Sequence, residues 1–273
     1  MLKPRRSCLL YAATAFILTA VSPALFAQYF DYPTAGVPRT PDGKPNLAAP
    51  APRTADGHPD FSGMWGWETR ANCGSKCNDT QVGREFLNIA VNLKGGLPYQ
   101  PWAAELVKKR AENHSKDDPQ VGCMPRGAIR DLTDDFYKRI IQTPDRLVIL
   151  SERNILYRQI HTDGRPLLVD PNPTWNGYST AKWDGDTLVV QTTGYRDDQW
   201  LDSAGNPLTS AAKSTEKFRR PNFGTLEIEV TVDDPKAYTA PWTITLKKPL
   251  VLDSELIDFY CLENEKDASH MGR

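Results

Sequence analysis

The sequence YSTAKWDGDTLVVQTT at residues 178–193 contains two β-prone runs that flank the dipeptide Asp184-Gly185. Asp-Gly favours a tight two-residue turn, because glycine adopts positive φ without a steric penalty. We therefore predict a β-hairpin with strands at 178–184 and 186–193. This is the strongest hairpin signal in the chain, and the fold prediction builds outward from it.

Short β-prone runs alternate with polar turns on both sides of this hairpin, most densely from Glu152 to Arg220. Because helices do not interrupt the runs, they predict a mainly β fold, an antiparallel up-and-down barrel, with a sandwich as the alternative. The barrel is favoured because closure removes exposed strand edges. The two short predicted helices lie at 81–92 and 101–113, and the further strands at 61–67, 140–143, 146–150, 155–160, 213–220, 225–232, 241–247 and 256–261.

The N-terminus has the pattern of an export signal at residues 1–27, in which a basic start precedes an apolar run from Cys8 to Val21. The run is short for a membrane anchor, so we expect a protein that is soluble after signal removal and periplasmic or secreted. The secretory and twin-arginine routes both stay open. Residues 28–59 are rich in Pro, Gly and Ala and predict an extended arm. Residues 60–273 follow as one barrel domain, with a helical insertion at about 81–116.

Four cysteines follow the signal, and an even number in an exported protein indicates disulfides. We prefer the pairs Cys73–Cys77 and Cys123–Cys261. The first would close a small loop, and the second would join the segment before the barrel to its C-terminal strand. Zinc is the rival interpretation, but the chain has one CxxxC spacing and no nearby histidine pair.

The composition and missing motifs narrow the possible functions. A formal net charge of -1 gives no indication of a nucleic-acid partner. The sequence contains no P-loop, GxGxxG, GxSxG or CxxCH motif, and its four histidines form no metal-binding spacing. We therefore predict no metal and no cofactor. The expected partner is a small molecule, as ligand or as substrate.

One arginine lies on an otherwise apolar strand face. Leu156, Arg158 and Ile160 share a face of the predicted strand, so Arg158 points inward if its neighbours do. A buried arginine requires a carboxylate partner. It would either form an internal bridge that fixes the strand register or bind a ligand. The candidate partners on neighbouring strands are Glu152, Glu216, Glu227 and Glu229.

Four aromatic residues in a short span could line a pocket for a flat or ring-shaped ligand. Ordinary core packing is the alternative for each of them. They are Trp175, Trp183, Tyr195 and Trp200.

Acid–base chemistry has three candidates, Glu216, Asp202 and His161. A carboxylate beside an arginine can move protons if burial shifts its pKa. His161 lies between Arg158 and the predicted hairpin tip at Asp163-Gly164-Arg165, although a surface histidine at a strand end is the more ordinary interpretation. Asp163 and Arg165 could also contact a ligand at the barrel mouth.

A set of seven motifs lies within residues 60–270. They are DFSGMW (60–65), CMPRG (123–127), YRQI with DGR (157–165), WDGDTLVV (183–190), WLD (200–202), DPKAY (234–238) and CLEN (261–264). This set resembles a family of exported bacterial proteins. The resemblance implies a fold similar to lipocalin-like barrels, but it implies no particular activity, because such barrels include both carriers and cofactor-free hydratases or isomerases. His161 departs from the apolar or aromatic residue that is more usual there, which makes it a weaker catalytic candidate.

Two functions fit these observations. The first is a barrel that binds a partly apolar, ring-containing molecule with an anionic or hydroxyl group. The second is a cofactor-free lyase, isomerase, hydratase or hydrolase on the same pocket, in which Arg158 holds the developing anion. We favour the binding barrel, because the sequence contains no recognisable catalytic constellation. A structural envelope protein is a third and weaker interpretation.

Overall fold

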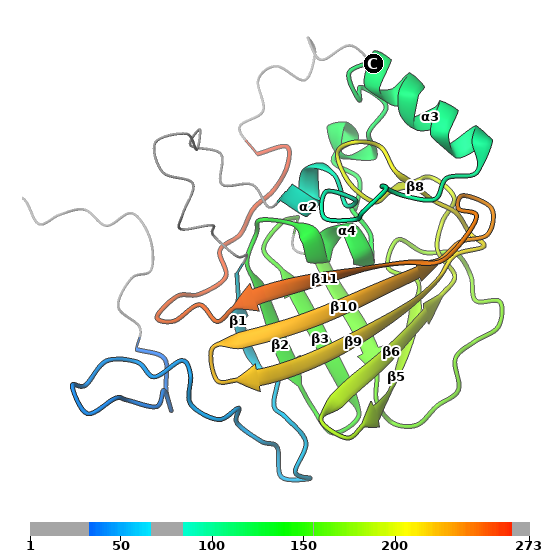
Figure 1. Ribbon diagram of the computed structural model, residues 1–273. Helices are drawn as coiled ribbons and strands as arrows, with labels where there is room; N and C mark the ends of the chain where they lie inside the picture. Colours follow the sequence, from blue (N-terminus) through cyan, green and yellow to red (C-terminus); the bar gives the residue numbers. More distant parts are fainter. Residues whose placement is uncertain (1–32, 67–83, 155, 264–273) are drawn as a thin grey trace, which may run out of the picture.

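The computed structural model of the 273-residue chain describes residues 33–66, 84–154 and 156–263 (Figure 1). The predicted signal at 1–27 and the predicted Cys73–Cys77 disulfide lie outside these residues. In the part described, no helix is long and apolar enough to cross a membrane.

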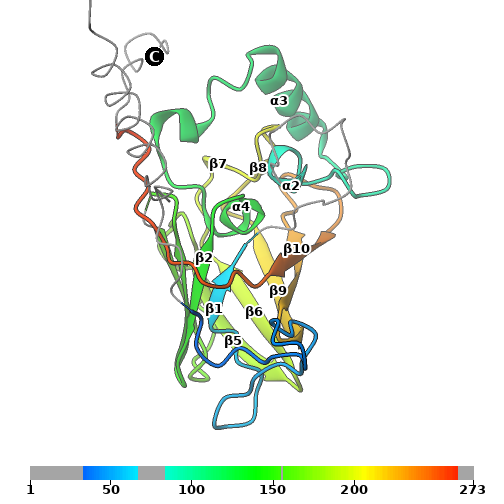
Figure 2. The same ribbon diagram turned by 90° about the vertical axis from the view of Figure 1, so that its left-hand side faces the viewer.

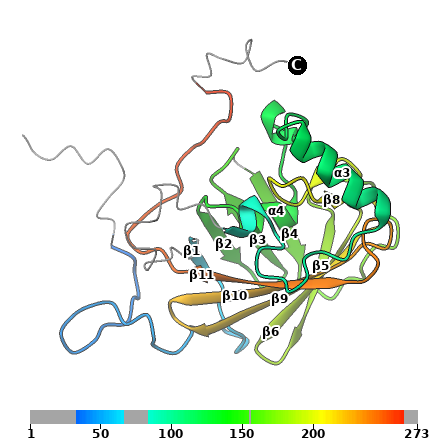
Figure 3. The ribbon, with the colours of Figure 1, turned by 45° about the horizontal axis from the view of Figure 1, so that its top comes forward.

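Nine strands form one curved sheet, which confirms the predicted mainly β, barrel-like fold (Figure 3). The strands follow one another around the sheet in chain order, because most are joined by short hairpin turns. They are β1 (Gly63–Trp65), β2 (Lys138–Gln142), β3 (Arg146–Ser151), β4 (Leu156–His161), β5 (Tyr178–Asp184), β6 (Thr187–Thr193), β9 (Lys213–Asn222), β10 (Thr225–Asp233) and β11 (Trp242–Pro249).

One neighbouring pair departs from the predicted antiparallel order. β4 and β5 run parallel and are paired only at Ile160 with Ser179 and at His161 with Thr180. A parallel pair cannot be joined by a tight turn, so residues 162–177 form a long connection that returns to the start of β5. The sheet is therefore mixed, and the wall is held by few backbone pairs at this seam.

The two ends of the sheet approach each other and nearly close the barrel. Trp65 at the end of β1 forms an isolated bridge with Leu250, just beyond β11. The Gly66 amide donates to the Pro249 carbonyl at 2.9 Å, and the Val251 amide donates to the Met64 carbonyl at 2.8 Å. These contacts pair edges that would otherwise expose unsatisfied backbone groups.

The core fills the barrel because apolar residues alternate with polar ones along the strands. β10 buries Leu226, Ile228, Val230 and Val232 almost completely, while the residues between them face outward. Burying each such side chain stabilises the fold by about 1.5–3 kcal/mol. A one-residue slip would move this whole apolar row to the solvent face, so the pattern also fixes the register.

Helices cover one end of the barrel, and the N-terminal arm surrounds the other (Figure 2). α4 lies over the end of the barrel interior and buries Ile129 and Leu132. Within the described residues, the helix predicted at 81–92 is limited to α2. The short elements at this end are α2 (Arg84–Leu87), α3 (Pro101–Glu112), η2 (Pro119–Gly122), α4 (Ala128–Thr133), β7 (Gln199–Trp200) and β8 (Pro207–Leu208).

The arm at residues 33–60 is attached to the barrel by side chains and backbone. Arg53 forms an ion pair of 2.6 Å with Asp186 in the β5–β6 turn, and His58 stacks on Trp183 at a centroid distance of 4.3 Å. The Phe223 amide donates to the Ala49 carbonyl at 2.8 Å. The arm is therefore extended, and these contacts fix its position against the barrel.

A disulfide joins Cys123 and Cys261, with Cα atoms 5.6 Å apart, as predicted. The prediction that Cys261 ends a strand at 256–261 is wrong, because Cys261 lies in a turn. The segment forms only a single parallel bridge, from Phe259 to Arg153. A β-prone run without a neighbouring edge to pair with does not become a strand.

Candidate functional site

A buried ion pair lies inside the barrel. Arg158 points inward from β4, as the alternation predicts, and donates from Nη1 and Nη2 to the two carboxylate oxygens of Glu216 on β9, at 2.8 Å each. The two side chains are 6% and 0% exposed. Of the four candidate partners, Glu216 alone forms an ion pair with Arg158 in the described part of the chain. This two-pronged geometry is the strongest form of an arginine–carboxylate contact.

Hydroxyl groups also contact the guanidinium. Arg158 Nη2 donates to Ser179 Oγ at 3.1 Å and to Thr192 Oγ1 at 3.0 Å, and these hydroxyls lie 2.9 Å from each other. Burial alone would lower the pKa of Arg158, but the charge of Glu216 and its hydrogen bonds outweigh that effect and raise the pKa. Arg158 therefore stays charged in the core.

Tyr195 extends this network on the carboxylate side. Its hydroxyl lies 2.6 Å from Ser214 Oγ, which donates to Glu216 Oε1 at 3.3 Å. Burial first, and then the charge of Glu216, raise the pKa of Tyr195 to about 12. Tyr195 is thus neutral and serves the internal network rather than an aromatic pocket wall.

A pocket of about 490 Å³ opens at the β4–β5 seam, where only two residue pairs hold the wall together. Its size suits a ring-containing small molecule, and its lining combines aromatic faces with a few polar groups. The lining residues are Pro125, Leu156, Tyr157, Gln159, His161, Thr174, Trp175, Asn176, Gly177, Tyr178 and Ser179. We call it the seam pocket.

Ser179 connects the seam pocket with the buried ion pair. It belongs to the pocket lining, and its hydroxyl accepts the hydrogen bond from Arg158. The arginine charge therefore lies one hydrogen bond behind the pocket wall. Sequence analysis missed Ser179 and Tyr178, because the signal that locates them is the parallel pairing of β4 and β5.

Two residues predicted from the sequence line the seam pocket. Trp175 carries the guanidinium of Arg196 over its ring at 4.8 Å. His161 lies 5.5 Å from the Tyr178 ring, centroid to centroid, and its buried Nδ1 has no hydrogen-bond partner in the part of the structure described. Burial first, and then the nearby Arg165, lower the pKa of His161, so the imidazole is neutral at pH 7.

Arg165 and Asp163 form an exposed pair next to the pocket. Arg165 Nη2 lies 2.6 Å from Asp163 Oδ2, and hydrogen bonding to Arg165 is the main reason that the pKa of Asp163 falls to about 2. Hydrogen bonding to Asp163 first, and then the neighbouring Tyr178, raise the pKa of Arg165. Tyr178 lines the seam pocket, so the pair lies beside that pocket.

Three of the four aromatic residues predicted to line a pocket do not line the seam pocket. Trp183 stacks under His58 at the arm end, Trp200 lies beneath the guanidinium of Arg110 at 4.2 Å, and Tyr195 is inside the barrel. Only Trp175 lines the seam pocket. Residues that are close in sequence were separated because the chain between them changes direction at each turn.

The two predicted catalytic carboxylates are buried and already accept hydrogen bonds from neighbouring residues. Glu216 is fully occupied by Arg158 and Ser214, as described above. Asp202 is fully buried and accepts hydrogen bonds from the Ile89 amide at 2.7 Å and the Asn206 amide at 3.1 Å. Burial raises the pKa of Asp202. Neither lines the seam pocket, so neither touches a molecule bound there.

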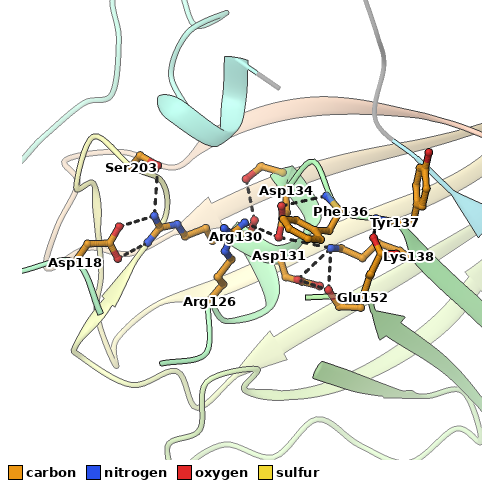
Figure 4. A network of polar contacts seen from close by, with 12 residues as sticks. Asp118, Arg126, Arg130, Asp131, Asp134, Phe136, Tyr137, Lys138, Glu152 and Ser203 are labelled. Carbon is orange, nitrogen blue, oxygen red and sulfur yellow. Dashed lines mark hydrogen bonds and ion pairs between the residues drawn. The ribbon is translucent and has the colours of Figure 1, made fainter. Parts of the chain in front are cut away.

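A second polar network lies at the α4 end of the barrel (Figure 4). Arg130 donates to both oxygens of Asp118, at 2.8 and 2.6 Å, while Arg126 pairs with Asp134. Lys138 lies 3.2 Å from Asp131. This network fastens α4 and the preceding loop to the sheet. It was not predicted, because its members come from a loop, a short helix and a strand.

The fold and site together define a nearly closed β-barrel with an ion-paired interior and a pocket at its parallel seam. No protein-family model, curated protein or solved structure matches this chain. Among the described residues, no group of three or more His, Cys, Asp or Glu side chains is arranged to hold a metal ion.

Proposed function

We propose that this protein is an exported barrel that binds a partly apolar, ring-containing small molecule in the seam pocket. The observation that carries the proposal is the pocket itself, which opens where the barrel wall has only two backbone pairs. Trp175 and Tyr178 supply aromatic faces, and His161 supplies a polar group beside Tyr178. A ligand hydroxyl or carboxylate would interact with this polar side.

Binding is favoured over catalysis because the carboxylates are occupied elsewhere. Glu216 and Asp202 are buried in hydrogen-bonded positions, and an acid or base must reach the proton that it moves. One observation keeps a cofactor-free acid–base enzyme as the second candidate. His161 is neutral in the pocket, and its Nδ1 has no partner among the described residues, so it could accept a proton.

An exported location and the family resemblance belong to the same proposal. The Cys123–Cys261 disulfide is compatible with an oxidising compartment such as the periplasm or the extracellular space. The N-terminal signal pattern supports export, and the motif set supports membership in the exported bacterial family described above.

Titration of the disulfide-intact protein with phenol, benzoate and cyclohexanol tests the proposal by calorimetry. The ring compounds should bind saturably, and Trp175→Ala should weaken binding about tenfold or more through loss of an aromatic contact. Trp102→Ala is the matched control, because Trp102 lies exposed on α3 and should leave affinity unchanged. Equal losses in the two variants, or no saturable binding of any ring compound, would refute the proposal.

Carrier and enzyme are separated by following the bound molecule. The protein is incubated with a small-molecule extract of its own organism, and ligand masses are compared before and after. Recovery of an unchanged ligand supports the carrier. Turnover that disappears in His161→Gln, while urea unfolding is unchanged, would instead establish the enzyme.

A further inference from the structure

One lysine lies inside the barrel without a partner to neutralise it. Along β11, Trp242, Ile244, Leu246 and Lys248 alternate with exposed residues and point inward. Lys248 is 6% exposed. In the part of the chain that the structure describes, no hydrogen bond or ion pair involves its ammonium group, in contrast to Lys138.

Lys138 and Lys248 lie on either side of β1 at the same end of the barrel. Trp65 on β1 pairs with Lys138 of β2 on one side and bridges to Leu250 on the other. Lys248 lies two residues before Leu250. The two lysines therefore flank one strand beneath α4.

Among the described residues, Lys138 makes the polar contacts that Lys248 lacks. Its Nζ donates to Ser151 Oγ at 2.9 Å and lies 3.2 Å from Asp131 and 3.8 Å from Asp134 (Figure 4). Ser151 Oγ in turn donates to Asp131 Oδ1 at 2.9 Å. These oxygens are thus already engaged, and Lys138 remains a fixed positive charge beside Lys248.

This environment raises the free-base fraction of Lys248 above that of an ordinary lysine. Burial is the main cause that lowers the pKa of Lys248, to about 8, and the positive charge of Lys138 lowers it further. Asp134 just after α4, Asp131 on α4 and Glu85 on α2 oppose the change without reversing it. Desolvation and a neighbouring cation are the two conditions that make a lysine amine nucleophilic near neutral pH.

We propose that Lys248 is a covalent site for small aldehydes, which it binds as an imine. The Nζ lone pair attacks the carbonyl carbon, a C–N bond forms, and a carbinolamine results. The carbonyl oxygen then leaves as water with the two amine protons, and a C=N bond remains. The reaction needs no oxidant or reductant. Restricted exposure limits the partner to small carbonyl compounds.

This site is independent of the seam pocket. Lys248 projects from β11, whereas the seam pocket is lined by residues of β4, β5, the loop before β5 and Pro125, and Lys248 is not among them. Loss of ring-compound binding in Trp175→Ala would leave the imine unaffected. Failure of imine formation would leave the seam pocket proposal standing.

Reductive trapping with acetaldehyde and cyanoborohydride tests the proposal on the intact protein. Acetaldehyde forms the imine, and the hydride of cyanoborohydride converts it to a stable N-ethyl group. Lys247 is the internal control, because it is adjacent in sequence but exposed and paired with Glu227 at 3.7 Å. At pH 7 we expect peptide mass spectrometry to show at least tenfold faster labelling of Lys248 than of Lys247. Labelling of Lys248 at or below the rate of Lys247 in folded protein would overturn the proposal.

Two variants provide a second readout by intact mass. At equal times, Lys248→Arg should carry one early adduct fewer than the unaltered protein, whereas Lys247→Arg should carry the same number. An unchanged number of early adducts in Lys248→Arg would contradict the assignment. If Lys248→Arg does not fold, the peptide comparison within the unaltered protein decides the question alone.

Discussion

Arg158 and Lys248 are both cations that point into the same barrel, but only one of them is paired. Arg158 meets both carboxylate oxygens of Glu216 and two hydroxyls, whereas Lys248 meets no such group among the described residues. A buried charge is either compensated or avoided by a change in protonation. The pKa of Arg158 is raised, and that of Lys248 falls to about 8.

The difference arises from what the neighbouring strands supply. β9 pairs with β6 so that Glu216 lies opposite Val190, within reach of Arg158 across the interior. The carboxylates that act on Lys248 are Asp134, Asp131 and Glu85. Asp131 and Asp134 already contact Lys138, and Glu85 accepts a hydrogen bond from Asn92. The comparison teaches that pairing decides whether a buried cation is structural or reactive.

Removing the carboxylate partner of Arg158 should have the largest effect on the free energy of unfolding. Glu216→Gln leaves Arg158 buried without a compensating charge, and we expect a loss of about 3–5 kcal/mol in the free energy of unfolding. Urea denaturation of the disulfide-intact protein measures it. The double variant Arg158→Met with Glu216→Leu should recover most of that loss, because both charges are removed together. A double variant as unstable as Glu216→Gln would show that the pair is not the cause.

Removing the unpaired cation should change the free energy of unfolding in the opposite direction. Lys248→Met should stabilise the protein at pH 7 by roughly 3 kcal/mol, because the unpaired ammonium is costly to bury. The unfolded chain holds this proton to its ordinary pKa of 10.5, whereas the folded chain releases it at about 8. The unfolded state therefore binds more protons between these values, and the stability of the unaltered protein should rise with pH there.

The pH series itself tests that assignment. Urea denaturation at pH 7, 8, 9 and 10 should show a stability difference between Lys248→Met and the unaltered protein that shrinks as pH rises. Lys247→Met is the control, since that side chain is exposed, and its difference should stay constant. A constant difference for Lys248→Met as well would mean that Lys248 keeps its proton throughout.

Strand alternation made much of the barrel predictable from sequence. The predicted strand at 178–184 coincides with β5, and the one at 225–232 falls one residue short of β10. The parallel pairing of β4 and β5 was not predictable, because the proline-containing loop at 162–177 carries no signal for where the chain returns. The strand predicted at 256–261 failed because formation of a strand also requires a free edge beside it.

The position of a site residue was predictable only where the alternation along a single strand determines it. Alternation along β4 placed Arg158 inside, but the choice of Glu216 among four glutamates depended on how β9 packs across the barrel. Trp175, Trp183 and Trp200 are near one another in sequence, but each has a different ring partner: Arg196, His58 and Arg110. Lys248 could have been found by the same alternation, because Trp242, Ile244 and Leu246 precede it on the buried face.

His161 is half-buried and has no carboxylate partner among the described residues, so its protonation should make ligand binding depend on pH. Burial and Arg165 lower the pKa of His161, so it should gain a proton only below pH 6.5. Benzoate, which stays ionised, should therefore bind the seam pocket about fivefold more tightly at pH 5 than at pH 7.5. Phenol serves as the neutral control and should show no such change. In His161→Gln, calorimetry should give a flat benzoate profile, and a slope that survives would point to another group.

The smallest effect is expected for a fully exposed ion pair. Arg53 and Asp186 resemble the interior pair in geometry, with two hydrogen bonds of 2.8 and 2.6 Å, but the side chains are 53% and 62% exposed. Water already solvates both charges, so forming the pair releases little free energy, and salt screens what remains. Asp186→Asn should leave the urea midpoint within error of the unaltered protein at moderate salt. A loss of stability comparable to that of Glu216→Gln would mean that attachment of the arm, rather than burial, determines how much an ion pair stabilises this barrel.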